Sequence, residues 1–131
     1  MEKKYLSKII ANDNEGLQII SACCAGAEIK ICDIKYLQKN KVFLLSLERT
    51  KIETENKDKK VNSILNFQFV DSVKSKNIKQ DDVDKKLELI TMDYLKNNNN
   101  YEISLIFTNN AYITLSTEII DLTLEDLNKI D

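Results

Sequence analysis

The chain of 131 residues contains one arginine, Arg49, and this side chain is the first candidate for chemistry. It continues the inward alternation of the apolar residues in 43–47, so we expect it at the rim of a core. There its planar guanidinium could hold a carboxylate or phosphate group of a ligand. A rim ion pair within the chain is the plainer interpretation, with Asp33, Glu48 or Glu118 as partner. The candidate binding residues are Arg49, Asp33, Tyr36 and Glu118.

The residue types on which most enzyme sites depend are absent or badly spaced. Histidine is missing, which removes the commonest general acid/base and metal ligand. Cys23 and Cys24 are neighbours that would point about 100° apart on a helix, so they cannot grip one metal ion. The only two glycines, Gly16 and Gly26, match no nucleotide-binding fingerprint. We expect no catalytic residue, no metal and no cofactor.

The charged clusters are also better explained as solvated surface than as sites. Lys74, Lys76 and Lys79 could contact phosphates, but a run of aspartates follows them at 81–84. That run lacks the central glycine of a calcium loop. With 19 basic and 21 acidic residues the net charge is −2, so no overall field attracts nucleic acid or an anionic membrane. We expect neither as a partner.

Composition predicts a single soluble domain over residues 1–131. The apolar fraction of 43% and charged fraction of 31% are typical of globular chains. The N-terminus lacks the apolar core of a signal peptide, and no stretch reaches the roughly 20 apolar residues that span a bilayer. Three cysteines without a disulfide-like spacing fit a reducing compartment, so we expect a cytoplasmic location.

Apolar spacing predicts one helix, over about 13–25. Its apolar residues recur every three or four positions, Asn12 and Glu15 have the spacing of a capping box, and Gly26 can end the helix. Elsewhere the apolar residues alternate with polar ones, which predicts about seven strands, the first over 5–11. The parity switches near 31–32, which indicates a bulge or a strongly curved strand. The charged segment 50–60 is predicted to be an exposed loop.

These elements predict an α+β fold. Short connections favour antiparallel neighbours, so we expect a curved, mostly antiparallel meander of about seven strands, a half-barrel with the N-terminal helix packed on an open face or end. A barrel of the pleckstrin-homology kind is the alternative, although the helix of that fold lies at the C-terminus.

The residues also resemble a bacterial family catalogued as domain of unknown function 2948. The resemblance covers nearly the whole chain, and the matching positions include Leu17, Ile20, Asp33, Tyr36, Phe43, Arg49, Leu65, Phe67, Ile103, Phe107, Leu115, Glu118 and Leu124. The family has no assigned activity. The resemblance therefore bears on the extent of the fold and not on its function.

For function, the leading hypothesis is a non-catalytic binding or protein-interaction module, and we consider an enzyme the weaker candidate. An intact core pattern without catalytic spacings favours this, and exposed edge strands offer sheet extension with a second copy or with a partner strand. The alternative is a small histidine-free enzyme that uses carboxylates or lysines near Arg49. A concave pocket in which carboxylates converge would favour the enzyme.

Overall fold

The computed structural model describes residues 8–50 and 60–127, which form one α-helix, two short 3-10 turns and ten strands. The helix is α1 (Asn14–Cys24), and the turns are η1 (Ile31–Asp33) and η2 (Gln38–Asn40). The strands are β1 (Lys8–Ala11), β2 (Glu28–Lys30), β3 (Ile34–Leu37), β4 (Val42–Thr50), β5 (Lys60–Phe67), β6 (Val70–Lys76), β7 (Lys86–Lys96), β8 (Tyr101–Phe107), β9 (Tyr112–Thr117) and β10 (Leu122–Asp126).

The predicted helix is confirmed, with a different cap. The Asp13 carboxylate accepts a hydrogen bond from the Gly16 amide at 2.8 Å, so the N-cap is Asp13 and the pairing expected of Asn12 with Glu15 is wrong. Gly26 follows the helix with a φ of 84°, the left-handed conformation that glycine adopts without steric cost. Most of the predicted loop 50–60, namely 51–59, lies outside the described residues.

The described residues form ten strands and not about seven, because alternating runs that look continuous in the sequence are broken in space. The parity switch at 31–32 is the turn η1, which ends β2 and starts β3. The long run 65–75 bends sharply at Phe69, whose φ of 59° separates β5 from β6. Both breaks shift the parity of the buried positions, and a parity switch in a sequence is equally compatible with a bulge inside one strand, so the sequence pattern does not show that a strand has ended.

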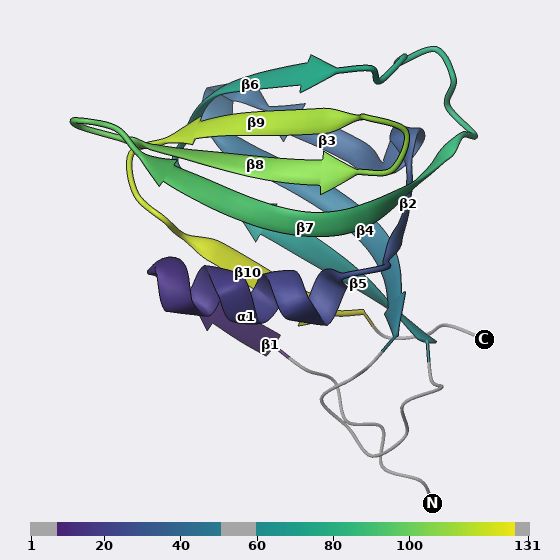
Figure 1. Ribbon diagram of the computed structural model, residues 1–131, viewed down its shortest axis with the longest axis horizontal. Coiled ribbons are helices and arrows are strands. Elements are labelled where there is room, and N and C mark those ends of the chain that lie inside the picture. Colours follow the sequence, from purple (N-terminus) through teal and green to yellow (C-terminus); the bar gives the residue numbers. More distant parts are fainter. Residues whose placement is uncertain (1–7, 51–59, 128–131) are drawn as a thin grey trace, which may run out of the picture.

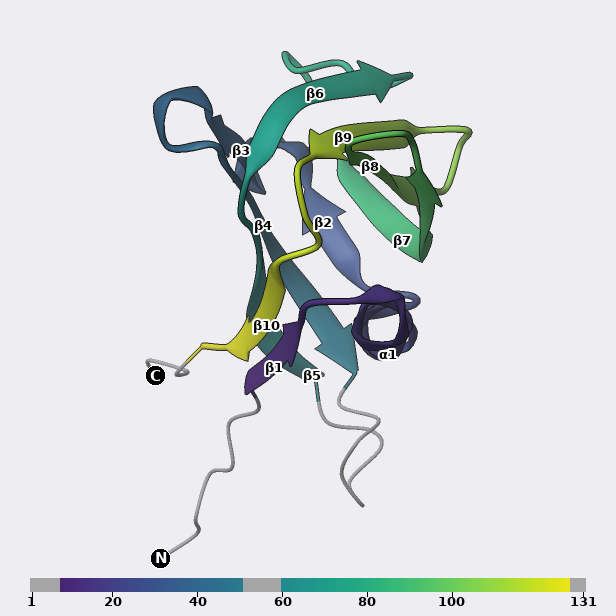
Figure 2. The same cartoon turned by 90° about the vertical axis from the view of Figure 1, so that its left-hand side faces the viewer.

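All strand pairs are antiparallel, but their order is not a simple meander. The path runs β1-β10-β5-β4-β2-β7-β8-β9-β6, and β3 adds to β4 beside β2. β5 pairs with β10 and β6 with β9, so these four strands form one long two-stranded ribbon that bends between its halves. Figure 2 shows the two halves of the curved sheet facing each other. The ten described strands form an open sheet, so the closed barrel considered as an alternative is wrong.

The helix fills one of the openings. Figures 1 and 2 show α1 lying beside β1 and below β7, and it contacts both strands. β2 pairs with β7 only through Lys86–Glu88, and the next part of the β7 edge faces the helix. There the Ser21 hydroxyl accepts a hydrogen bond from the Met92 amide at 2.9 Å, beside the bulge of β7. The helix therefore covers an open side of the sheet, as expected.

Candidate functional site

Arg49 lies in the core and not at its rim. Its residue exposure is 1%, and its Nε donates to the Ser63 hydroxyl at 3.1 Å while Nη2 contacts the Asp126 carboxylate at 3.0 Å. Ser63 in turn donates to the same Asp126 oxygen at 2.7 Å. The expected rim position and rim ion pair are therefore wrong. Asp126, on β10, is a buried partner of Arg49.

This buried network holds three strands together. Arg49 lies on β4, Ser63 on β5 and Asp126 on β10, and β5 pairs with both of the others. Buried charges are tolerated when each is paired and hydrogen-bonded, which the three side chains accomplish for one another. The network fixes the last strand to the sheet. Asp126 shares the inward parity of Leu122 and Leu124, and that alternation was the signal by which the sequence could have revealed it.

Asp33 and Glu48 lie together, in a polar groove on the outer side of β2, β4 and β5. The groove has a volume of about 440 Å³, and its lining also includes Glu28, Lys30, Ser46, Asn62 and Lys86. Glu28 and Lys86 are 3.7 Å apart, as are Glu48 and Lys60, and all four side chains are about half exposed or more. These carboxylates are solvated and have lysine partners.

The register aligns three glutamates across this groove. Glu28 lies opposite Glu48 on β4 and opposite Glu88 on β7, so three carboxylates share one face. Like charges placed directly opposite one another destabilise a sheet, and the neighbouring lysines offset that repulsion. No three Cys, Asp or Glu side chains within 8–50 and 60–127 are grouped so that they could hold a metal ion.

Tyr36 lies at a second hollow, between β3 and β6, on a different side of the molecule from Arg49 and its network. Its hydroxyl donates to the Val70 carbonyl at 2.8 Å, and the Val70 amide donates to the Lys41 carbonyl at the same distance. These bonds connect β3 and the residue before β4 to the first residue of β6. Its volume is about 330 Å³, and its lining consists of Ile31, Cys32, Ile34, Tyr36, Phe43, Val73, Ser75, Ile78, Gln80 and Ile113. We call this hollow the β3–β6 slot.

Glu118 belongs to neither hollow. It lies in the turn before β10, where its amide donates to the Phe69 carbonyl at 3.3 Å. Lys41 forms an ion pair with Asp71 at 3.0 Å. The hydrogen bond from Lys41 to the Asp71 carboxylate, and then the negative charge of that carboxylate, raise the pKa of Lys41. Glu118 and Tyr36 raise this pKa further. The four candidate binding residues are thus divided among a buried network, a groove, a slot and a turn.

The β3–β6 slot has a property that the polar groove lacks, namely two strand edges beside it. Within the described residues, β3 pairs only with β4, and β6 pairs only with β9. Figure 2 shows β6 leaving the neighbourhood of β3 and arching over β9. The sequence did not reveal this site, because Val73, Ser75 and Ile78 had no recognisable partner across the fold.

Residues 7–131 match the model of a family described as "Protein of unknown function (DUF2948)". The chain belongs to this family. Membership of DUF2948 confirms the resemblance seen in the sequence, and the family description assigns no activity. No curated protein and no solved structure matches the chain. No helix of the described DUF2948 residues is long and apolar enough to cross a membrane.

Proposed function

We propose that the chain is a non-catalytic protein-interaction module that takes an extended segment of a partner protein into the β3–β6 slot. The observation that carries this proposal is the pair of strand edges beside one apolar hollow. A segment placed there would pair its main chain with the edges and insert alternate side chains into the hollow. This is the recognition mode called strand addition.

The main chain supplies the first part of the argument. β6 is seven residues long and is the last strand on the path of the sheet. Residues Ser72–Lys76 pair on one side with β9, so every second amide and carbonyl on the other side is available among the described contacts. β3 presents a second, shorter edge. Free strand edges of this kind are templates for another strand.

The side chains supply the second part. Ile34 and Tyr36 of β3 face Leu45 and Phe43 of β4 in register, and they share their inward orientation. On β6, Val73 and Ser75 lie opposite Leu115 and Ile113 and also point inward. The floor of the slot is therefore apolar, with a few polar groups at its sides. A volume of about 330 Å³ lies within the usual range of ligand pockets.

The enzyme hypothesis lacks a comparable observation. The carboxylates near one another in the polar groove are solvated and paired with lysines, and the Arg49 guanidinium is directed at Ser63 and Asp126 in the core. Nothing in this arrangement aims an acid, a base and an anion-binding group at one point. A binding role for the slot is the better-supported proposal.

Amide chemical shifts of the isotope-labelled chain can test the proposal. Three capped octapeptides serve as probes, in which valine alternates with glutamate, with serine or with lysine. We expect at least one of them to shift the amides of Ile34–Leu37 and Ser72–Lys76. A peptide N-methylated at every second amide should lose most of this effect, because it cannot complete the ladder.

A matched pair of variants provides the control. Ser75→Trp places an indole in the slot, whereas Ser72→Trp places it on the outer face of the same strand, opposite Ser116. Only Ser75→Trp should abolish binding. The proposal is overturned if no probe at up to about 1 mM shifts these amides, or if N-methylation changes nothing.

A further inference from the structure

We infer that the segment accepted by the β3–β6 slot is acidic, with carboxylate side chains alternating with apolar ones. This inference rests on the proposed function and names the chemistry of the partner. It is carried by the charges on the two strand edges. Among Ile34–Leu37 and Ser72–Lys76 there are three lysines, Lys35, Lys74 and Lys76, and no carboxylate.

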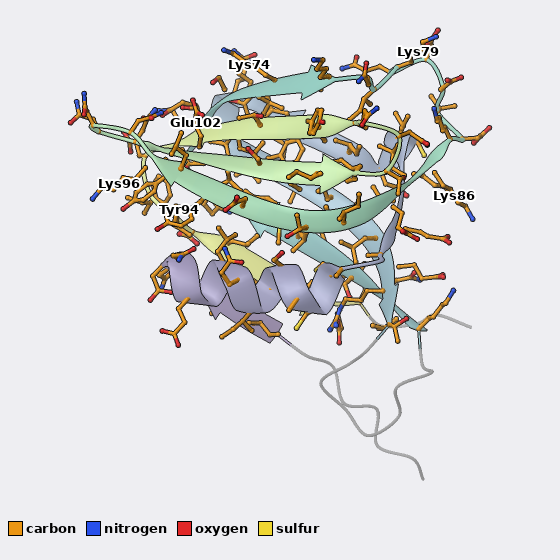
Figure 3. The ribbon with its side chains drawn as sticks, in the orientation of Figure 1. Lys74, Lys79, Lys86, Tyr94, Lys96 and Glu102 are labelled. Carbon is orange, nitrogen blue, oxygen red and sulfur yellow. The ribbon has the colours of Figure 1, made fainter. Side chains whose placement is uncertain are left out.

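The three lysines all face outward. Lys35 lies opposite Leu44, on the side of the sheet away from Tyr36 and Phe43, and it is exposed. Lys74 and Lys76 are exposed as well and lie opposite Thr114 and Tyr112 on the outer face. Figure 3 shows Lys74 pointing away from β6 into solvent, with Lys79 beyond it in the following loop. The outer side of the slot is therefore positively charged on both flanks.

The nearby carboxylates do not cancel this charge on the strands themselves. Asp71, at the start of β6, is paired with Lys41 at 3.0 Å. Asp81, Asp82 and Asp84 lie in the loop between β6 and β7, together with Lys79 and Lys85. Along Ile34–Leu37 and Ser72–Lys76, the charged side chains that an incoming strand meets are all lysines.

The alternation of a strand converts this charge into a sequence pattern. Side chains of an extended segment point in turn to opposite faces, so those at one parity enter the apolar floor and those at the other lie among the lysines. Cross-strand neighbours on one face are about 4.5–5.5 Å apart between Cβ atoms, within reach of a lysine–glutamate pair. Opposite charges at such positions favour pairing, and like charges oppose it.

The same lysines argue against two other occupants. Antiparallel pairing of β6 with β6 of a second copy would bring Lys74 and Lys76 of both chains onto one face, where they repel one another. A nucleic acid would find phosphate contacts on the outer face, but it has no side chains that could fill the apolar floor by strand alternation. An acidic strand can place apolar side chains on the floor of the slot, pair its main chain with the strand edges and place its carboxylates beside the lysines.

The dissociation constants of the three octapeptides test whether the slot prefers an acidic segment. We expect the valine–glutamate peptide to bind roughly tenfold more tightly than the valine–serine peptide, and the valine–lysine peptide to bind most weakly. Raising the ionic strength from about 0.05 M to about 0.5 M should remove most of this preference, because exposed charges are screened. A thymidine octanucleotide and sedimentation of the free chain test the other two occupants.

Charge reversal sharpens the test. The triple variant Lys35→Glu, Lys74→Glu and Lys76→Glu should prefer the valine–lysine peptide. A second triple variant, Lys8→Glu, Lys30→Glu and Lys96→Glu, changes the net charge equally and is the control. It should bind the three peptides in the same order of affinity as the wild-type chain. The inference fails if the wild-type chain binds all three peptides equally, even though the slot would then still be a strand acceptor. It also fails if the nucleotide alone shifts β3 and β6, or if the chain dimerises through β6. Absence of any binding overturns the proposed function instead.

Discussion

A buried charge network is the main feature at the scale of single residues. Arg49, Ser63 and Asp126 bond to one another across three strands, and the two charged side chains are fully shielded from water. The sequence singled out Arg49 because it was the only arginine and continued an inward alternation. The alternation in 122–126 could have marked Asp126 as inward-facing, but not as the partner of Arg49, because the two residues are 77 positions apart and nothing local connects them.

Removing one partner of this network should destabilise the fold strongly. We expect Asp126→Ala to lower the free energy of unfolding by about 3–5 kcal/mol, because the buried Arg49 loses its ion pair with Asp126. Urea denaturation measures the change. The double variant Arg49→Met with Asp126→Leu removes both charges and should lose far less. A loss under about 1 kcal/mol for Asp126→Ala would show that Arg49 reaches solvent or another carboxylate.

The elements were predictable to the extent that their signals are local. The helix was found because its apolar spacing and its closing glycine lie within 13–26. The strands were found but not correctly divided, because the parity switches at η1 and at the bend of Phe69 look the same in a sequence as bulges inside one strand. The Ser21 contact with β7 was beyond sequence analysis, since it joins residues 71 positions apart.

The start of the helix offers a test in which two effects have opposite sign. Alanine is a better helix former than glycine by about 1 kcal/mol, so propensity predicts that Gly16→Ala stabilises α1. A Cβ at Gly16 would however lie 2.9 Å from both Cα and Cβ of the buried Ala11, so β1 must shift. We expect a net loss of about 1–3 kcal/mol in the free energy of unfolding. Gln18→Ala, at an exposed position of the same helix, is the control and should change little; a stabilised Gly16→Ala variant would mean that β1 gives way freely.

At the scale of the whole molecule, strand order was the part that the sequence withheld. Alternation shows which face of a strand is buried but not which strand lies beside it. The placement of β10 between β1 and β5, and of β6 beyond β9, depends on pairings between distant segments. The β3–β6 slot exists only because of that order. The sequence could therefore single out Tyr36 but not the residues that lie across the slot from it.

The open architecture predicts an uneven pattern of amide hydrogen exchange. β6 and β3 are paired on one side only among the described strands, whereas β5 and β8 have neighbours on both sides. We expect the amides of β3 and β6 to exchange through local opening, faster than those of β5 and β8, which should require global unfolding. Exchange followed by NMR or mass spectrometry measures this. Equal protection of β6 and β8 would indicate that another segment covers the free edge.

The bent ribbon has a mechanical consequence. Because β5 continues into β6 and β10 follows β9, the same two chain segments carry Ser63 and Asp126, which bind Arg49, at one end and the open edge at the other. The two ends meet at the corner of the ribbon, where the Glu118 amide donates a hydrogen bond to the Phe69 carbonyl. A force that moves the β6 edge away from β3 would therefore be transmitted through this corner to β5 and β10. Displacement of the outer strand and the stability of the ion pair between Arg49 and Asp126 are mechanically connected.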